Sequence, residues 1–224
     1  DLGLGRAPGT DQLTLRALRR SNESAERFPQ DVLELQALLG PPQPGQYIHA
    51  IPGEGTEVPL WILGSSTFGA RLAAELGLPY SFASHFAPQQ LLQALEVYRS
   101  HFRPSKQLER PYAMVGVNII AAESDAEARR LATTQQMSFV DLVRGTRLHS
   151  KPPIDDIESY WTPLEKAQVT RMLERSIVGS PRTVREGIEA LIAETAADEL
   201  IIVSDVSFEL IVEAYPPLQR DGLP

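Results

Sequence analysis

A short run of small and hydroxyl residues carries the clearest chemical signal in the sequence. Trp61-Ile-Leu-Gly-Ser-Ser-Thr-Phe-Gly-Ala70 reads as a buried strand, a Gly64-Ser65-Ser66 turn and the start of a helix. The free N–H groups and the dipole of a helix N-terminus favour an anion such as phosphate. The serine hydroxyls add donors, and Gly64 and Gly69 allow a ligand to approach the backbone closely. A serine-capped turn without a ligand explains Ser66 equally well.

Arg6 is the second candidate for anion binding. It follows a short β-rich run, Leu2–Gly5, and a side chain just after the C-terminal end of a strand faces the mouth of an α/β barrel, where active sites lie. A guanidinium group is well shaped for bidentate contacts with phosphate. The alternative is a surface arginine paired with an acid such as Asp11. Neither a Gly-x-Gly-x-x-Gly turn nor a Gly-Lys-Ser/Thr sequence accompanies these residues, which disfavours nucleotide hydrolysis.

His85, in Ser81-Phe-Ala-Ser-His-Phe86, is the third candidate, because it also follows the end of an expected strand. A lone histidine is more often structural than catalytic, so His85 is a pocket candidate with both interpretations open. No histidine has metal-ligand spacing, and the Asp155-Asp156 pair has no histidine nearby, so we expect no metal site. The sequence has no cysteine, which excludes disulfides and thiolate chemistry.

Alternating strands and helices are expected to position these candidates. Strands are predicted at Leu2–Gly5, Val58–Leu63, Tyr80–Ala83, Tyr112–Ala121 and Leu200–Val203. Helices are predicted around apolar stripes at 32–39 and 91–98, over Asp125–Arg144 with Ser124 as N-cap, and from Ser180-Pro181 through Thr183–Glu194. Strands joined by crossover-length helices predict a parallel sheet. Both a doubly wound sheet and a barrel fit this pattern, and a closed barrel needs about eight strands.

Two segments interrupt this alternation. Residues 40–59 carry five prolines and four glycines, which predicts an ordered loop without regular structure. Residues 145–163 form a second long loop, which is typical of a lid or an interface element, and plain disorder is the alternative. We expect one domain over residues 1–224.

Composition narrows the class of protein. The apolar fraction of 42% and the charged fraction of 22% are those of a globular protein. The net charge of −8 and the lack of a dense basic run argue against a nucleic-acid partner. No run approaches the roughly 20 apolar residues of a membrane span, so we expect no membrane association. The cytosol, a cytoplasmic location, is the default expectation.

The order of several motifs resembles the bacterial-luciferase-like family of flavin-dependent monooxygenases. The motifs are Gly5-Arg-Ala-Pro-Gly-Thr-Asp11, Leu63-Gly-Ser-Ser66, Ala73-Ala-Glu-Leu-Gly-Leu-Pro79, Ser84-His-Phe-Ala-Pro88, Val178-Gly-Ser-Pro-Arg-Thr-Val184 and Asp198-Glu-Leu-Ile201. The resemblance runs the length of the sequence and implies an α/β (β/α)8 TIM barrel. The sequence starts at Asp1 inside an expected strand, so we expect a partial barrel without its first three or so β/α units.

The resemblance also implies a cofactor and site residues. Arg6, Gly64, Ser65, Ser66 and Gly69 would bind the phosphate of FMN, with only a backbone contact at Gly69. The residues expected to line the flavin or substrate pocket are Ala7, Pro8, Phe82 and His85.

The implied activity is a monooxygenase in which reduced FMN and O2 oxygenate a small organic substrate, such as an aldehyde or another carbonyl compound. A separate flavin reductase is a possible partner, and a homodimer or larger assembly is expected. One alternative is an oxidoreductase of the same fold that transfers hydride with the deazaflavin F420. Another is a non-catalytic protein that binds flavin or completes a partner.

Overall fold

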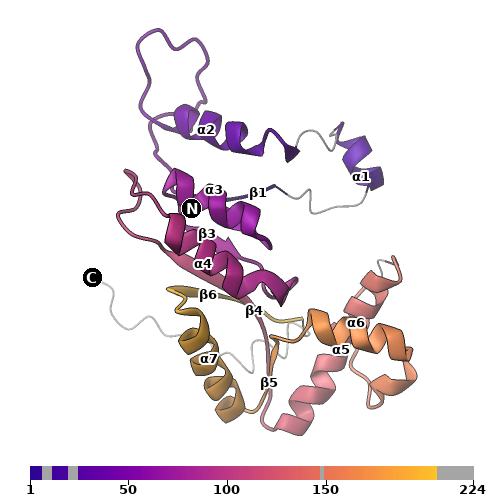
Figure 1. Ribbon diagram of the computed structural model, residues 1–224. Coiled ribbons are helices and arrows are strands. Elements are labelled where there is room, and N and C mark those ends of the chain that lie inside the picture. Colours follow the sequence, from indigo (N-terminus) through magenta and orange to yellow (C-terminus); the bar gives the residue numbers. More distant parts are fainter. Residues whose placement is uncertain (7–11, 20–24, 147–148, 206–224) are drawn as a thin grey trace. The chain divides into compact units, whose positions relative to one another are not determined.

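A computed structural model describes residues 1–6, 12–19, 25–146 and 149–205 of the chain (Figure 1). The chain forms two compact units. The first consists of Asp1–Ala83 and Gln90–Val115, and the second of Ser84–Gln89 and Gly116–Pro224. The two units are described in turn.

The first unit is built on parallel strands. They are β1 (Leu2–Gly5), β2 (Leu60–Gly64), β3 (Tyr80–Phe82) and the start of β4 (Ala113–Ala121), paired in that order. Gly5 lies opposite Leu63, and Gly64 lies opposite Phe82. Because the strands are parallel, the C-terminal ends of β1, β2 and β3 meet at one edge of the sheet, and the residues that directly follow β1 and β2 lie near each other.

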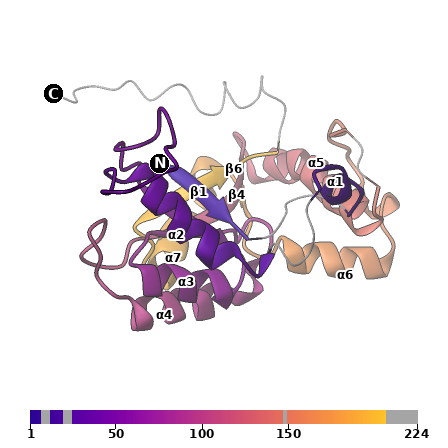
Figure 2. The same ribbon diagram turned by 90° about the horizontal axis from the view of Figure 1, so that it is seen from above.

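Four helices accompany these strands. They are α1 (Gln12–Ala17), α2 (Phe28–Leu39), α3 (Thr67–Leu76) and α4 (Leu91–His101). A 3-10 turn, η2 (Pro88–Gln90), precedes α4 and begins in the second unit. Helices α3 and α4 lie side by side (Figure 2). Helix α3 packs against β2 and β3, and α4 packs against β3. The core between them contains Tyr80, Phe82 and Tyr98, all fully buried. The Tyr98 hydroxyl donates to the Leu78 carbonyl at 2.9 Å, which satisfies its polar tip in the core.

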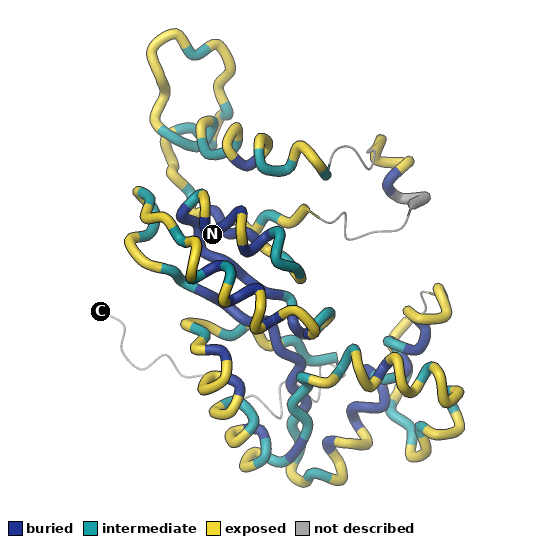
Figure 3. Tube along the Cα trace, in the orientation of Figure 1, coloured by how far each residue is buried: buried dark blue, intermediate teal, exposed yellow. Residues whose placement is uncertain are grey.

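The segment 40–59 links α2 to β2 and contains neither helix nor strand. Its two ends are joined by backbone hydrogen bonds from Gly55 to Gly40 at 2.9 Å and from Glu57 to Leu39 at 3.0 Å. Most of the loop is exposed in Figure 3, and the Tyr47 side chain is 97% exposed. The loop is therefore ordered by its own backbone and projects its side chains to the surface.

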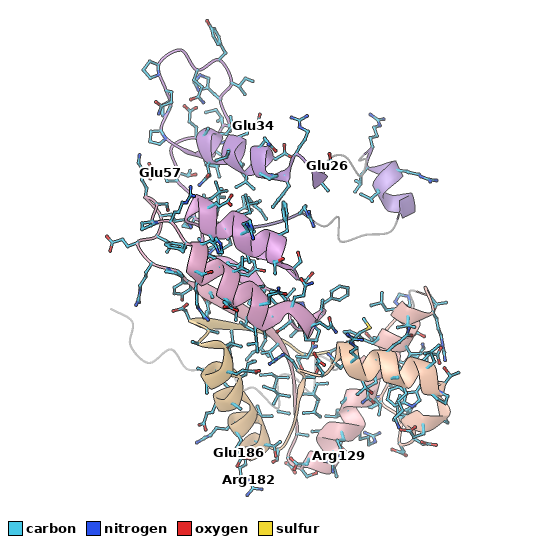
Figure 4. The ribbon with its side chains drawn as sticks, viewed as in Figure 1. Glu26, Glu34, Glu57, Arg129, Arg182 and Glu186 are labelled. Atoms are coloured by element: carbon cyan, nitrogen blue, oxygen red, sulfur yellow. The ribbon has the colours of Figure 1, made fainter. Side chains whose placement is uncertain are left out.

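The second unit contains the rest of β4 with β5 (Ile177–Gly179) and β6 (Glu199–Val203) paired to it, and helices α5 (Asp125–Val143), α6 (Pro163–Met172) and α7 (Pro181–Thr195). Strand β5 runs parallel to β4. Ser124 caps α5 by accepting from the Glu127 N–H at 3.2 Å, as expected for an N-cap serine. The surface of α7 carries Arg182 and Glu186 one turn apart (Figure 4).

The described part of the 145–163 segment is attached to α5. The Lys151 carbonyl accepts from the Thr134 hydroxyl at 2.9 Å, and Tyr160 donates to an Asp141 carboxylate oxygen at 2.9 Å. Lys151 contacts both Asp141 and Tyr160, and its hydrogen bond holds the pKa of Asp141 below the ordinary value. A 3-10 turn, η3 (Ile157–Ser159), leads into α6.

The α/β class with a parallel sheet is confirmed, and several boundaries shift. Strand β2 begins at Leu60 rather than Val58: the first hydrogen bond of its ladder with β1 runs from the Leu2 N–H to the Pro59 carbonyl at 2.9 Å, and Pro59 has no N–H with which to extend the ladder further back. Strand β5 and helix α6 were not predicted. Helix α7 starts at Pro181 with Ser180 as N-cap, as the sequence indicates.

Candidate functional site

The ends of β1 and β2 bring the first two sequence candidates together. Gly5 and Leu63 are the last pair of the β1–β2 ladder, and Arg6 and Gly64 are the residues that follow them. The Gly64-Ser65-Ser66 turn follows and leads directly into α3, whose first residue is Thr67. The predicted strand, turn and helix are thus present, and the arginine lies beside the turn.

The N-terminus of α3 has no side-chain cap. Ser66 occupies the N-cap position with φ −149° and ψ 169°, yet its hydroxyl caps no backbone N–H. The hydroxyls of Ser65, Ser66 and Thr67 form no hydrogen bond with any residue that the structure describes. The first turn of α3 contains no acidic residue. Because the first N–H groups of a helix lack intrahelical partners, this end of α3 presents free donors and the positive end of the helix dipole.

Arg6 is exposed and is similarly available for a ligand. Within the described residues it has no hydrogen bond and no ion pair, while Asp11, its alternative partner from the sequence, lies outside them. Its guanidinium carbon lies 3.9 Å from the centroid of the Phe68 ring, within the range of a cation–π contact. The positive charge therefore sits beside the N-terminal turn of α3 without a counter-ion from the described chain.

Tyr80 binds the Gly64-Ser65-Ser66 turn through a hydrogen bond. Its hydroxyl donates to the Ser66 carbonyl at 3.1 Å, and burial raises the pKa of Tyr80, which keeps the hydroxyl protonated. A Cβ built on Gly64 would lie 3.6 Å from Gly69 Cα and from the Tyr80 hydroxyl, and one on Gly69 would lie 3.4 Å from the Tyr80 ring. These are ordinary van der Waals distances, so the turn, the start of α3 and the Tyr80 ring pack against one another around the two glycines.

The remaining candidates of the first unit differ in their placement. Phe82 ends β3, is fully buried, and packs its ring edge-to-face against Tyr80 with centroids 6.3 Å apart. Ala7 and Pro8 lie outside the described residues. Phe82 is therefore a core residue beside the turn in this structure, and a role for it in lining a pocket stays a prediction.

His85 belongs to the second unit and is held there by its backbone. Its carbonyl accepts from Asn118 Nδ2 at 2.6 Å, and the neighbouring Ser84 hydroxyl donates to the Gly116 carbonyl at 2.5 Å. His85 Nδ1 is buried without a partner, and burial lowers the pKa of the ring. An unpaired N–H is costly to bury, so the neutral tautomer with its proton on Nε2 is favoured. In that form His85 is a hydrogen-bond donor rather than a cation.

Three side chains that support these candidates were not predicted from the sequence: Phe68 under Arg6, Tyr80 under the turn and Asn118 beside His85. Asn118 had a readable signal, because it is the one polar residue in the apolar run 113–121 and is only 3% exposed. Such a buried amide needs hydrogen-bond partners. The other two contacts join distant parts of the chain and leave no local pattern.

Three other features of the described residues could indicate a function: a membrane-spanning helix, a metal site and another hollow. No helix in the described ranges is long and apolar enough to cross a membrane, and no group of three His, Asp or Glu side chains there is placed to hold a metal ion. A hollow of about 1030 Å³ lies between α2, the 40–59 loop and Gln107. It adjoins Leu60, where β2 begins, and so lies at the opposite end of the strand from the turn.

Comparison with known proteins identifies the family. The sequence profile described as luciferase-like monooxygenase matches residues 1–199. A protein of Escherichia coli (strain K12) named luciferase-like monooxygenase is 46% identical over 227 residues, covering 97% of this chain and 68% of that protein. The protein YvbT of Bacillus subtilis (strain 168) is 50% identical over 224 residues, covering 96% of this chain and 67% of that protein.

Solved structures agree with this result. The crystal structure of apo-MsnO8 matches with a TM-score of 0.73 and 29% identity, covering 96% of this chain and 68% of that one. Two structures share the fold at lower identity and differ in cofactor. One is a type II Baeyer–Villiger monooxygenase of Pseudomonas putida in complex with FMN, with a TM-score of 0.51 and 17% identity over 94% of this chain and 66% of that one. The other is an F420-dependent secondary alcohol dehydrogenase with an F420–acetone adduct, with a TM-score of 0.59 and 12% identity over 96% of this chain and 68% of that one. The α/β chain with its parallel strands therefore belongs to the luciferase-like monooxygenase family, whose TIM-barrel fold its structure matches.

Proposed function

We propose that this protein is an FMN-dependent monooxygenase and that Arg6 and the N-terminus of α3 bind the phosphate of the flavin. The observation that carries the proposal is the group of unused donors at the ends of β1 and β2. Arg6 and the hydroxyls of Ser65, Ser66 and Thr67 have no partner in the described chain, and α3 starts there without a side-chain cap. Polar groups of this kind are suited to an anionic ligand.

The residues present fit a phosphate monoester. Such a group carries close to two negative charges and three terminal acceptor oxygens. Arg6 supplies the positive charge, and the turn supplies hydroxyl and backbone N–H donors from a helix end without acidic residues. A phosphodiester, as in F420, exposes only two such oxygens and one charge. The donor set therefore favours FMN over the deazaflavin F420.

When bound, reduced FMN would supply the two electrons with which one atom of O2 enters a small organic substrate, such as an aldehyde or a related carbonyl compound, while the other atom leaves as water. The chain itself would anchor and orient the cofactor. Arg6 and α3 would hold the phosphate end, and Tyr80 would keep the turn in place. A role for His85, in the second unit, in lining a pocket stays a prediction. A separate reductase would supply the reduced flavin.

The test compares the dissociation constants of FMN and riboflavin, which lacks the phosphate. A charge-assisted hydrogen bond contributes about 1.5–3 kcal/mol, so Arg6→Ala should weaken FMN binding at least tenfold and leave riboflavin binding unchanged. Arg103→Ala is the matched control, because Arg103 is an exposed arginine whose backbone adjoins Gly77 at the opposite end of α3. An unchanged FMN dissociation constant for Arg6→Ala would overturn the assignment.

The absorption spectrum of the purified holoprotein separates FMN from F420. Oxygen-dependent turnover of an aldehyde with externally reduced FMN then distinguishes a monooxygenase from a protein that only binds flavin. Tight binding without turnover would overturn the enzymatic part of the proposal.

A further inference from the structure

Phe68 is placed to control where the Arg6 side chain points. It is the second residue of α3, adjacent to the turn, and it is partly exposed. Arg6 comes from a different strand, yet its guanidinium carbon lies 3.9 Å above the centre of the Phe68 ring. A free surface arginine samples many rotamers. The ring therefore provides a surface that selects the orientations of Arg6 that lie over the start of α3.

The contact leaves the donors of Arg6 available. The N–H groups of a guanidinium lie in its plane and point outward from its edge. The Phe68 ring carries no charge and no lone pair, so its contact with the cation neither pairs the charge nor provides a hydrogen-bond acceptor that would occupy these donors. Since Arg6 has no hydrogen bond or ion pair with the described part of the chain, Phe68 orients the charge without neutralising it.

The ring is itself held by the fold. The Tyr80 hydroxyl donates to the Ser66 carbonyl at 3.1 Å, two residues before Phe68. Tyr80 is fully buried in β3, so the start of α3 is tied to the core strand. The position of Arg6 thus depends on a chain of contacts that runs from Tyr80 through the turn to Phe68.

We propose that Phe68 is a positioning residue that holds the Arg6 guanidinium at the N-terminus of α3, ready to bind the phosphate of the flavin. This inference rests on the proposed function of that site. Phe68 acts through Arg6 and needs no contact with the ligand. Removing the aromatic face should therefore weaken phosphate recognition without changing how the rest of the flavin binds.

The experiment measures the ratio of the FMN and riboflavin dissociation constants, a quantity that does not depend on the fraction of folded protein. Phe68→Leu keeps an apolar side chain and removes the ring, and it should shift the ratio against FMN by about two- to fivefold, the range of an exposed cation–π contact. Phe68→Tyr keeps the ring and should restore the wild-type ratio. In an Arg6→Ala background, Phe68→Leu should have no further effect on the ratio.

Each other outcome overturns a defined part of the argument. If Arg6→Ala shifts the ratio and Phe68→Leu does not, the positioning role is wrong and the phosphate site stands. If Phe68→Leu shifts the ratio equally with and without Arg6, Phe68 contacts the ligand itself and does not act through Arg6. If Arg6→Ala leaves the ratio unchanged, the phosphate site fails, and the role of Phe68 fails with it.

Discussion

Gly77 is the C-cap of α3, the helix whose N-terminus forms the candidate phosphate site. Replacing Gly77 by alanine should strongly destabilise the protein. The residue ends α3 in the left-handed region with φ +63°. A Cβ there would lie 2.5 Å from the Arg103 carbonyl oxygen and 2.6 Å from Ser105 Cβ. The first is a backbone atom and the second is bonded directly to the backbone, so neither can move away by a change of side-chain rotamer.

The magnitude follows from two separate costs. Left-handed backbone costs a residue with a Cβ about 1–2 kcal/mol, and overpacking adds about 1–3 kcal/mol. Gly45 isolates the first cost, because it has φ +82° and nothing within 4 Å of a built Cβ. We expect Gly77→Ala to lower the free energy of unfolding by about 2–4 kcal/mol and Gly45→Ala by about 1 kcal/mol, after the smaller unfolded-state entropy of alanine is included.

The assay is urea unfolding followed by tryptophan fluorescence in a Trp161→Phe background, so that the signal comes from Trp61, which is 9% exposed in the same unit as Gly77. The comparison uses the difference between the two variants, in which errors of the linear extrapolation largely cancel. If Gly77→Ala is no more destabilising than Gly45→Ala, the close contact with residues 103–105 is not a constraint on the fold, and the reasoning is refuted.

Two further predictions concern pH. The Asp125 carboxylate accepts from the Ser180 N–H at 2.6 Å and the Thr183 hydroxyl at 2.8 Å, and these bonds lower its pKa from 3.8 to about 2. The stabilisation by this carboxylate is therefore complete above pH 3.8 and is lost as the pH falls through 2. Asp125→Asn should reduce the dependence of the melting temperature on pH between these values. The same pH dependence in the variant and the wild type would contradict the assignment. Burial lowers the pKa of His85 below 6.5, so the unfolded chain binds the proton more tightly and stability should fall as the pH drops below 6.5. His85→Gln should remove this part of the dependence of the melting temperature on pH. If the melting temperatures of the variant and the wild type fall equally steeply below pH 6.5, His85 is not the group responsible.

Local sequence signals were sufficient to predict the start of a helix, because the residues that cause it lie within one turn of it. Ser124 before α5 and Ser180-Pro181 before α7 mark helix starts, because the cap and the proline act on the adjacent turn. A similar signal precedes α6, where Thr162 and Glu165 form a capping box, so that helix was readable though not predicted. Strand β5 was not readable, because a three-residue strand is defined by its pairing with β4.

The sequence by itself determined the chemistry that this protein has available: the arginine after one strand, the small hydroxyl-rich turn after another, and the parallel α/β pattern that places both at strand ends. Only the tertiary structure decided how those groups are used. The parallel pairing of β1 with β2 brings Arg6 over Phe68, and the Ser66 hydroxyl leaves the N-terminus of α3 uncapped. Contacts between residues far apart in the chain depend on sheet register and side-chain rotamers, which no local pattern of residues specifies.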